Sequence, residues 1–258
     1  MFWKLRKQFK PGFFAFCYQI LEKVLFLFPF DKYHCVSLYT LNTLRTLFGI
    51  QDNKLNLIYN GVDNDFRDPE KVMSLSIAQW REKYNRWEKF VLLYYGHAGK
   101  SKGIDTIIHA LPKILSQDEN TIMVFNLIPC KRDNEIKKKI QEQAKKSGFL
   151  DRITIFSWWD IEQLRTLVAS VDAVIAPSLA EGFGSVHSEV CSMGKPLITT
   201  RVAAIPEVVS GKVVFMTPGD VGDLVNAIEK VKKQEFENLP PKSFSREKSV
   251  EEIEKMYE

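Results

Sequence analysis

From Phe90 onward, short apolar runs alternate with amphipathic segments. The runs with the length of buried strands are Phe90–Tyr95, Thr121–Leu127, Ile153–Phe156, Ala173–Ala176, Leu197–Thr200 and Val213–Met216. Helical spacing between them predicts helices near 104–117, 133–147, 160–170, 184–193, 205–210 and 220–233. Strands that are apolar on both faces and separated by helices are typical of a parallel sheet covered on both sides. The pattern predicts an α/β fold with a doubly wound, Rossmann-like sheet.

The pattern differs on both flanks of this region. Before it, we expect strands at Cys35–Leu38 and Asn56–Tyr59, a helix at Leu41–Phe48, a turn at Asn60-Gly61 and a helix around Ile77–Trp87. After it, residues 239–245 break the pattern and a last helix is expected over 246–257. We therefore divide the chain into an N-terminal appendage (1–63), a Rossmann-like domain (64–240) and a C-terminal helix (241–258).

The charge of the chain is concentrated at its N-terminus. The formal balance is 36 − 32 = +4, and residues 1–30 hold five bases against one acid, which is the whole excess. The neutral remainder argues against nucleic-acid binding. Apolar residues between Phe13 and Phe30 recur at helical spacing, in a stretch too short to span a membrane. This segment either packs on protein or lies on an anionic membrane surface, with Lys4–Lys10 at the lipid headgroups.

The loop after Phe90–Tyr95 contains three glycines and two lysines between Gly96 and Gly103. Glycine allows close approach of the backbone to a ligand and lysine supplies positive charge, so the loop is typical of an anion site. A P-loop would require glycine where Tyr94 stands. We expect an anion-binding loop that is not a P-loop, and a tight turn with solvated lysines is the alternative.

A second loop follows Ala173–Ala176 and carries Glu181, Gly182 and Gly184 before a predicted helix. The exposed amides and the dipole at a helix N-terminus favour a phosphate group there. Glu189 lies about one and a half turns into the helix, so both glutamates can face one crevice. Because phosphate repels carboxylates, the hydroxyls of a ribose or sugar are their expected partners. His187, taken alone, is more typical of a packing residue.

Two further acidic features give weaker signals. Glu207, after the strand Leu197–Thr200, faces a ligand or complements the dipole of its own helix. Asp63 and Asp65 have the spacing with which some sugar-transferring enzymes hold a divalent metal, but no ligating partner stands near them in the sequence. The four cysteines lie far apart and show no zinc-site spacing. We predict no metal site.

Together, four motifs resemble the retaining glycosyltransferases of family 4, also described as glycosyl transferases group 1, which have the two-domain GT-B fold. The motifs are Ile58–Asp63, Gly96 with Lys102-Gly103, Glu181-Gly182-Phe183-Gly184 with Glu189, and Ile205-Pro206-Glu207. They occur in the family's order from about residue 31 to the end of the chain. The chain thus resembles the C-terminal, donor-binding half of such an enzyme.

The resemblance implies metal-independent hexosyl transfer, without a cofactor, from a UDP- or GDP-linked sugar to a glycan or lipid-linked acceptor. Lys102 would neutralise the donor diphosphate and Glu181 would lie at the donor sugar; these are the predicted catalytic residues. Glu189 would hold the ribose. The other predicted donor-binding residues are Gly96, His97, Lys100, Ser157, Trp158, Trp159, Gly182, Phe183, Gly184 and Ser185, with 157–159 at the base and the amides of 183–185 at the diphosphate.

Two departures from the family change these expectations. His97 stands where the family usually has arginine, and we expect Lys100 to compensate. The N-terminal acceptor domain is missing apart from its end, so we expect donor binding without transfer by this chain alone, and a separate N-terminal GT-B subunit as partner. A nucleotide-sugar-binding module, or an inactive fragment or subunit of a split enzyme, is the alternative. The family's habits imply a cytoplasmic location, peripheral at the inner face of the cytoplasmic membrane.

Overall fold

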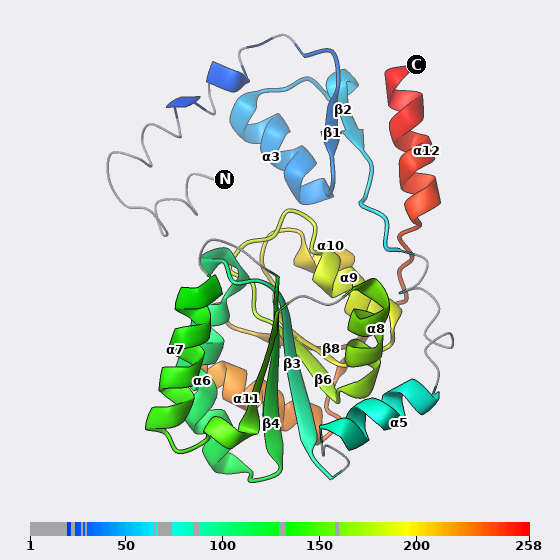
Figure 1. Cartoon of the computed structure of the whole chain (residues 1–258). Coiled ribbons are helices and arrows are strands. Elements are labelled where there is room, and N and C mark those ends of the chain that lie inside the picture. Colours follow the sequence, from blue (N-terminus) through cyan, green and yellow to red (C-terminus); the bar gives the residue numbers. More distant parts are fainter. Residues whose placement is uncertain are drawn as a thin grey trace.

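The computed structural model describes residues 20–21, 24–26, 28, 30–63, 66, 74–84, 88–128, 133–157 and 160–258. A small unit lies above a larger α/β domain (Figure 1). The small unit, residues 33–57, pairs strand β1 (Tyr33–Cys35) in parallel with β2 (Leu55–Leu57) and places helix α3 (Leu38–Phe48) between them in sequence. It is a short βαβ unit, with a 3₁₀ turn η1 (Asp52–Lys54) before β2.

The larger domain contains a seven-stranded sheet in the order β5-β4-β3-β6-β7-β8-β9. All neighbouring strands are parallel except β8 and β9, which are antiparallel. The order reverses direction between β3 and β6, the point at which doubly wound sheets bind ligands. The strands are β3 (Phe90–His97), β4 (Thr121–Ile128), β5 (Ile153–Ser157), β6 (Ala173–Ala176), β7 (Leu197–Thr200), β8 (Gly211–Met216) and β9 (Glu237–Leu239).

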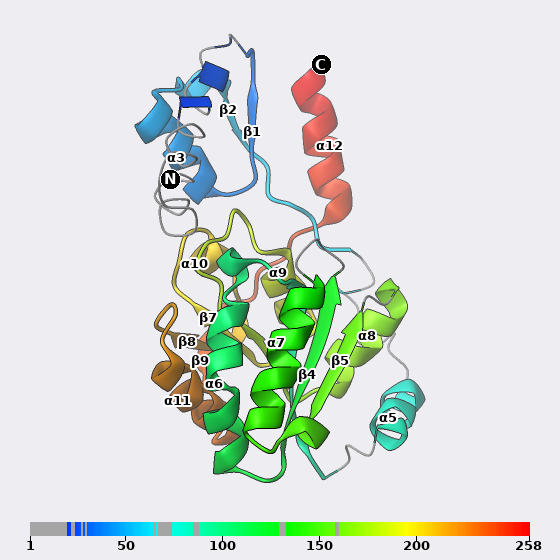
Figure 2. The ribbon, with the colours of Figure 1, turned by 60° about the vertical axis from the view of Figure 1, so that its left-hand side comes forward.

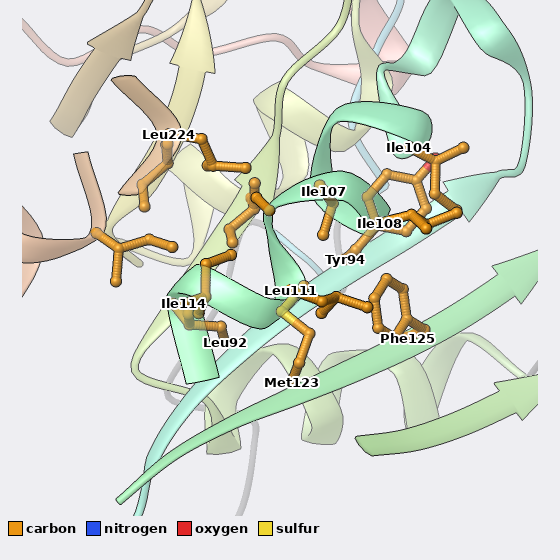
Figure 3. Packing of buried hydrophobic residues seen from close by; sticks show 14 of the residues in the cluster. Leu92, Tyr94, Ile104, Ile107, Ile108, Leu111, Ile114, Met123, Phe125 and Leu224 are labelled. Atoms are coloured by element: carbon orange, nitrogen blue, oxygen red, sulfur yellow. The ribbon is translucent and has the colours of Figure 1, made fainter. Parts of the chain in front are cut away.

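Helices cover both faces of this sheet because successive strand side chains alternate between faces. On β3, Leu92 and Tyr94 pack toward α6 (Ile104–Gln117), α7 (Asp133–Lys146) and α11 (Val221–Lys232), and Figure 3 shows them against Ile107 and Ile114 of α6. Val91, Leu93 and Tyr95 face the other layer. That layer contains α5 (Ser74–Lys83), α8 (Ile161–Ser170), α9 (Ser185–Ser192) and α10 (Ile205–Val208).

The chain passes between the small unit and the larger domain twice, side by side. The Val62 amide donates to the Phe244 carbonyl at 2.9 Å, and Val62 bridges Ser245 in parallel. Helix α12 (Arg246–Tyr257) then lies beside the small unit in both views (Figures 1 and 2). Two bonds support this placement: Ser249 Oγ donates to the Tyr59 carbonyl, and Lys32 Nζ donates to the Met256 carbonyl, each at 2.7 Å.

The predicted fold class is confirmed, and the predicted strands of the larger sheet are all present. Three details of the prediction are wrong. The strand expected at Cys35–Leu38 lies earlier, at Tyr33–Cys35, because Ser37 already caps the following helix. Helix α3 begins at Leu38, three residues early, because Ser37 and Thr40 form a reciprocal capping box. Neither Asn60 nor Gly61 has a positive φ, so the expected turn is absent there. Gly61 instead permits close approach, since a Cβ on it would lie 2.1 Å from the Cα of Arg246.

The predicted N-terminal amphipathic helix falls mostly outside the described residues, which include none before Ile20. Ile20, Leu21, Val24 and Leu25 are helical, and their side chains are exposed. Across the described ranges, no helix is long and apolar enough to cross a membrane.

Candidate active site

A cavity of about 530 Å³ opens at the carboxyl ends of β3 and β6, where the strand order reverses. Strand β3, the loop after β6 and the first turns of α9 supply most of its polar lining. The lining residues are Phe66, Tyr94, Tyr95, Gly96, His97, Lys102, Ile128, Ile161, Leu164, Ala176, Ser178, Glu181, Ser185, Val186, His187 and Glu189. The structure therefore brings both predicted glutamates and Lys102 to one cavity.

Lys102 and Glu181 form an ion pair in this cavity. Lys102 Nζ lies 2.6 Å from Glu181 Oε2, and the Ser178 hydroxyl lies 3.4 Å from the same carboxylate oxygen. Lys102 is the last residue of the 3₁₀ turn η3 (Lys100–Lys102) after β3, whereas Glu181 is on the loop after β6. A fixed cation beside a carboxylate can bind an anionic group on one side and hydroxyls on the other.

Contacts between the two loops set the geometry of this pair. The Ser101 carbonyl accepts from the amides of Leu179 and Ala180, at 2.7 and 3.2 Å. Gly103, with a φ of +73°, lies so close to the second loop that a Cβ on it would be 2.0 Å from the Pro177 carbonyl oxygen. Any side chain at position 103 would therefore push the two loops apart.

Lys100 is not brought into this cavity. In a 3₁₀ helix with three residues per turn, positions two apart point in different directions. Lys100 lines a separate hollow over α6 and α7, together with Asp105, His109 and Glu135. The expected compensation of His97 by Lys100 stays a prediction, and the geometry does not favour it.

The N-terminus of α9 borders the cavity. Gly184, with a φ of +104°, precedes the helix, and Ser185 and Val186 of its first turn line the cavity. The amides of a first helical turn have no intrahelical partner and carry the positive end of the dipole. This edge of the cavity is thus suited to a phosphate group.

Glu189 lies deep in the cavity and accepts a hydrogen bond from the Tyr95 hydroxyl at 2.9 Å. Burial raises the pKa of Glu189 to about 7, although the bond from Tyr95 acts in the opposite direction. Burial also raises the pKa of Tyr95 well above its usual range, so the phenol keeps the proton that it donates. With a pKa of about 7, Glu189 is partly ionised at neutral pH, and its ionised form can accept hydrogen bonds from the hydroxyl groups of a ligand.

His187 is buried beneath the same loop. Its Nε2 lies 2.9 Å from the Thr199 hydroxyl and 3.3 Å from the Ala176 carbonyl, while Nδ1 has no hydrogen-bond partner within the described part of the chain. Burial lowers the pKa of His187 to about 4, so the ring is neutral at physiological pH. These contacts agree with the packing role expected from the sequence.

The sequence profile described as glycosyl transferases group 1 matches residues 76–249, more than half of the chain. The chain belongs to this family. An uncharacterised glycosyltransferase of Methanocaldococcus jannaschii is 29% identical over 238 residues, which are 88% of this chain and 59% of that protein. The GPI3 subunit of phosphatidylinositol N-acetylglucosaminyltransferase of Saccharomyces cerevisiae is 24% identical over 202 residues, covering 78% of this chain and 42% of the subunit.

Solved glycosyltransferase structures share the fold. HepE of Anabaena, in complex with UDP and glucose, superimposes with a TM-score of 0.74 at 18% identity, covering 88% of this chain and 62% of HepE. A glycosyltransferase of Rickettsia africae gives 0.75 at 19% identity, with the same coverage. At such identity the likeness shows the GT-B-type fold alone. The chain spans about half the length of the curated relatives it matches.

Of the remaining predicted site residues, some line the cavity and others lie outside it. Gly96 and His97 line the cavity, whereas Ser157 ends β5 outside its lining and accepts from Lys137 Nζ at 2.5 Å. Trp158 and Trp159 lie outside the described residues. The Phe183 side chain is buried against the rings of Tyr59 and Phe244, so only its backbone remains for a ligand.

The sequence did not single out several residues that this glycosyltransferase chain places at the cavity. Tyr95 and Ser178 contact the two glutamates, and Ile128, Ile161 and Leu164 form an apolar wall. The available signal for Tyr95 was a tyrosine directly before the glycine loop, near the carboxyl end of β3. The apolar wall had no comparable signal, since Ile128 ends β4 whereas Ile161 and Leu164 belong to α8.

The two weaker acidic signals have structural partners. Glu207 does not serve its own helix alone, since its carboxylate accepts from the backbone amides of Leu38 and Tyr39 at the start of α3. Asp63 pairs with Arg246 at 2.6 Å, and Asp65 is outside the described residues. Across the described ranges, no three His, Cys, Asp or Glu side chains cluster so as to hold a metal.

Proposed function

We propose that this chain binds a nucleoside diphosphate sugar and supplies the donor half of a retaining, metal-independent hexosyl transfer of the family 4 type. The observation that carries the proposal is the combination of Lys102, the α9 N-terminus, Glu181 and Glu189 in one cavity at the sheet's switch point. HepE, which shares the fold, was solved with UDP and glucose.

The diphosphate lies between Lys102 and the amides at the start of α9. Breaking the bond between sugar and diphosphate develops negative charge on the departing nucleotide, and fixed cations and helix amides stabilise that charge without a metal. Without ligand, Lys102 is held by Glu181 at 2.6 Å. The diphosphate competes for Lys102, and Glu181 then turns its oxygens toward hydroxyls of the donor sugar.

The nucleoside occupies the inner part of the cavity. Glu189, with Tyr95 behind it, accepts the ribose hydroxyls. The apolar wall of Ile128, Ile161 and Leu164 is suited to one face of a base. The predicted base contacts of Ser157, Trp158 and Trp159 follow from the resemblance and stay a proposal. UDP- and GDP-linked sugars are the proposed donors.

The acceptor half is proposed to come from further polypeptide. The relatives are about twice as long as the matched region, so a separate N-terminal GT-B subunit would complete the cleft for a glycan or lipid-linked acceptor. One relative is itself named as the GPI3 subunit of phosphatidylinositol N-acetylglucosaminyltransferase. A nucleotide-sugar-binding module, or an inactive fragment or subunit of a split enzyme, is the alternative that this partial coverage favours.

Calorimetric titration of the full chain with UDP-, GDP- and ADP-linked sugars tests donor binding. We expect one base to be bound with a one-to-one ratio, and Lys102→Ala to weaken that binding. Lys100→Ala is the matched control, because it removes a cation two residues away that does not line the cavity. A folded chain that binds none of these sugars would refute the proposal. Single-turnover assays with and without an N-terminal subunit then separate transfer from binding alone.

A peripheral cytoplasmic location is a second proposal, supported by the basic and aromatic composition of residues 1–30. Liposome co-sedimentation of the full chain and of a chain without residues 1–30 tests it. Binding to anionic but not neutral vesicles, lost on deletion, would support the proposal. Equal sedimentation of both chains would refute it.

A further inference from the structure

The hydroxyl of Ser37, in the small unit, donates to the backbone carbonyl of Gly182 at 2.6 Å. Ser37 is the N-cap of α3 and is completely buried, whereas Gly182 lies on the loop between Glu181 and α9. The small unit therefore contacts the backbone of the loop to which the donor diphosphate is assigned.

The capping box at Ser37 leaves its single hydroxyl proton for Gly182. Ser37 Oγ accepts from the Thr40 amide at 3.1 Å, and the Thr40 hydroxyl uses its own proton to donate to the Ser37 carbonyl at 2.8 Å. The Thr40 hydroxyl oxygen is also within reach of Ser37 Oγ, but at 3.0 Å it is farther than the Gly182 carbonyl. The shorter bond to a carbonyl takes the proton.

This bond fixes the orientation of one peptide group. In a planar trans peptide, the carbonyl of one residue and the N–H of the next point in opposite directions. Because Ser37 holds the Gly182 carbonyl toward α3, the N–H of Phe183 points away from the small unit. Glu181 and Ser185, on either side of this peptide, both line the cavity.

The Phe183 side chain prevents the loop from rotating out of this orientation. Its ring is buried, edge-on to Phe244 at a centroid distance of 5.2 Å, and 6.2 Å from the ring of Tyr59. Both partners belong to the segments that join the small unit to the larger domain. The carbonyl of this peptide is thus held by the small unit, and the neighbouring side chain by the segments that join the small unit to the larger domain.

We propose that Ser37 is a positioning residue of the donor site, which holds the Gly182–Phe183 peptide so that the Phe183 N–H faces the donor diphosphate. This inference rests on the proposed function. An amide that is already oriented needs no reorganisation when the anion binds. Through Ser37, residues 33–57 would therefore contribute to the affinity of the donor site.

The test compares Ser37→Ala with Thr40→Val in the full chain. Both variants disrupt the capping box of α3, but only Ser37→Ala removes the bond to Gly182. Titrations use the nucleoside diphosphate and the nucleoside monophosphate of the base that the wild-type chain binds. We expect Ser37→Ala to weaken diphosphate binding by about five- to tenfold, which is the loss of one oriented hydrogen bond. Monophosphate binding should change less than about twofold, as should both ligands with Thr40→Val.

The Phe183 amide gives a direct readout by NMR. Its proton resonance should shift downfield when the diphosphate binds to the wild-type chain and to Thr40→Val, and much less in Ser37→Ala. Equal losses of diphosphate affinity in the two variants, or an unchanged affinity in Ser37→Ala, would overturn the positioning role. If the wild-type chain bound neither nucleotide, the proposed function itself would fail, and the positioning role with it.

Discussion

The Glu207 carboxylate accepts a hydrogen bond from the backbone amide of Leu38 at 2.7 Å, although 169 positions separate the two residues in the chain. The Tyr59 hydroxyl donates to the same oxygen at 3.1 Å, and the second oxygen accepts from the Tyr39 amide at 2.9 Å. The first amides of a helix lack intrahelical partners. A side chain of the larger domain thus satisfies the N-terminus of a helix in the small unit.

Removing this carboxylate should loosen the junction between the two parts. Glu207→Ala leaves two α3 amides and the Tyr59 hydroxyl without an acceptor, so we expect the free energy of unfolding to fall by about 1–3 kcal/mol. Urea denaturation measures the change. Glu251→Ala is the control, because Glu251 pairs with Lys255 on the exposed surface of α12. Indistinguishable unfolding of the two variants would show that the Glu207 contacts do not stabilise the junction.

The two lysines of η3 should contribute differently to donor binding. Lys102→Ala removes the cation that lines the cavity, and we expect nucleoside diphosphate affinity to fall by about 10- to 100-fold, the value of one charged hydrogen bond. Lys100→Ala should change it by less than about twofold. Calorimetry on both variants measures the difference. If Lys100 compensates for His97, as the sequence led us to expect, Lys100→Ala will weaken binding as much.

The buried carboxyl of Glu189 should make stability depend on pH. Its pKa is raised from 4.5 to about 7, so between these values the folded chain binds more protons than the unfolded chain. Stability from this group is therefore complete below about pH 4.5 and is lost as the pH rises through 7. Glu189→Gln lacks the group, so its stability relative to wild type should rise by about 3 kcal/mol between pH 4 and 8. Urea midpoints across this range measure it, and parallel curves would exclude the shift.

Donor affinity should also rise with pH. Ribose hydroxyls donate to the ionised form of Glu189, and with a pKa of about 7 the ionised fraction grows about tenfold between pH 6 and 8. We expect nucleoside diphosphate affinity to increase by up to about tenfold over this range. In Glu189→Gln the affinity should be lower and free of this slope. The same slope in both proteins would assign it to the ligand or to another group.

The larger sheet could be predicted from the sequence because its strands are apolar on both faces. Ala173–Ala176 and Leu197–Thr200 were predicted with their observed bounds for this reason. Strand β9 could not be predicted, since Glu-Asn-Leu carries no apolar pattern and pairs only at the sheet edge. The predicted turn at Asn60-Gly61 is absent, because the glycine is needed for the close approach to α12 and not for a positive φ.

The candidate site, like the sheet, could be predicted only where the signal is local in the sequence. Glu181, Glu189 and Lys102 were predicted because spacing and loop position are local properties of the sequence. The contacts of Tyr95 with Glu189, of Ser37 with Gly182 and of Glu207 with Leu38 were not predicted, because they join residues 94 to 169 positions apart in the chain. The compensation of His97 by Lys100 stays a prediction, although Lys100 lines a separate hollow and lies two positions from Lys102 in the 3₁₀ turn η3.

Gly103 has a consequence for how the spacing of charges in this cleft can evolve. Its missing Cβ allows the two loops to touch, and Lys102 is the residue next to it. A methyl group at position 103 would collide with Pro177 and separate the cation from the carboxylate of Glu181 while both side chains stayed intact. Substitutions at position 103 would therefore change the distance between Lys102 and Glu181, although glycine itself has no side chain that could take part in binding.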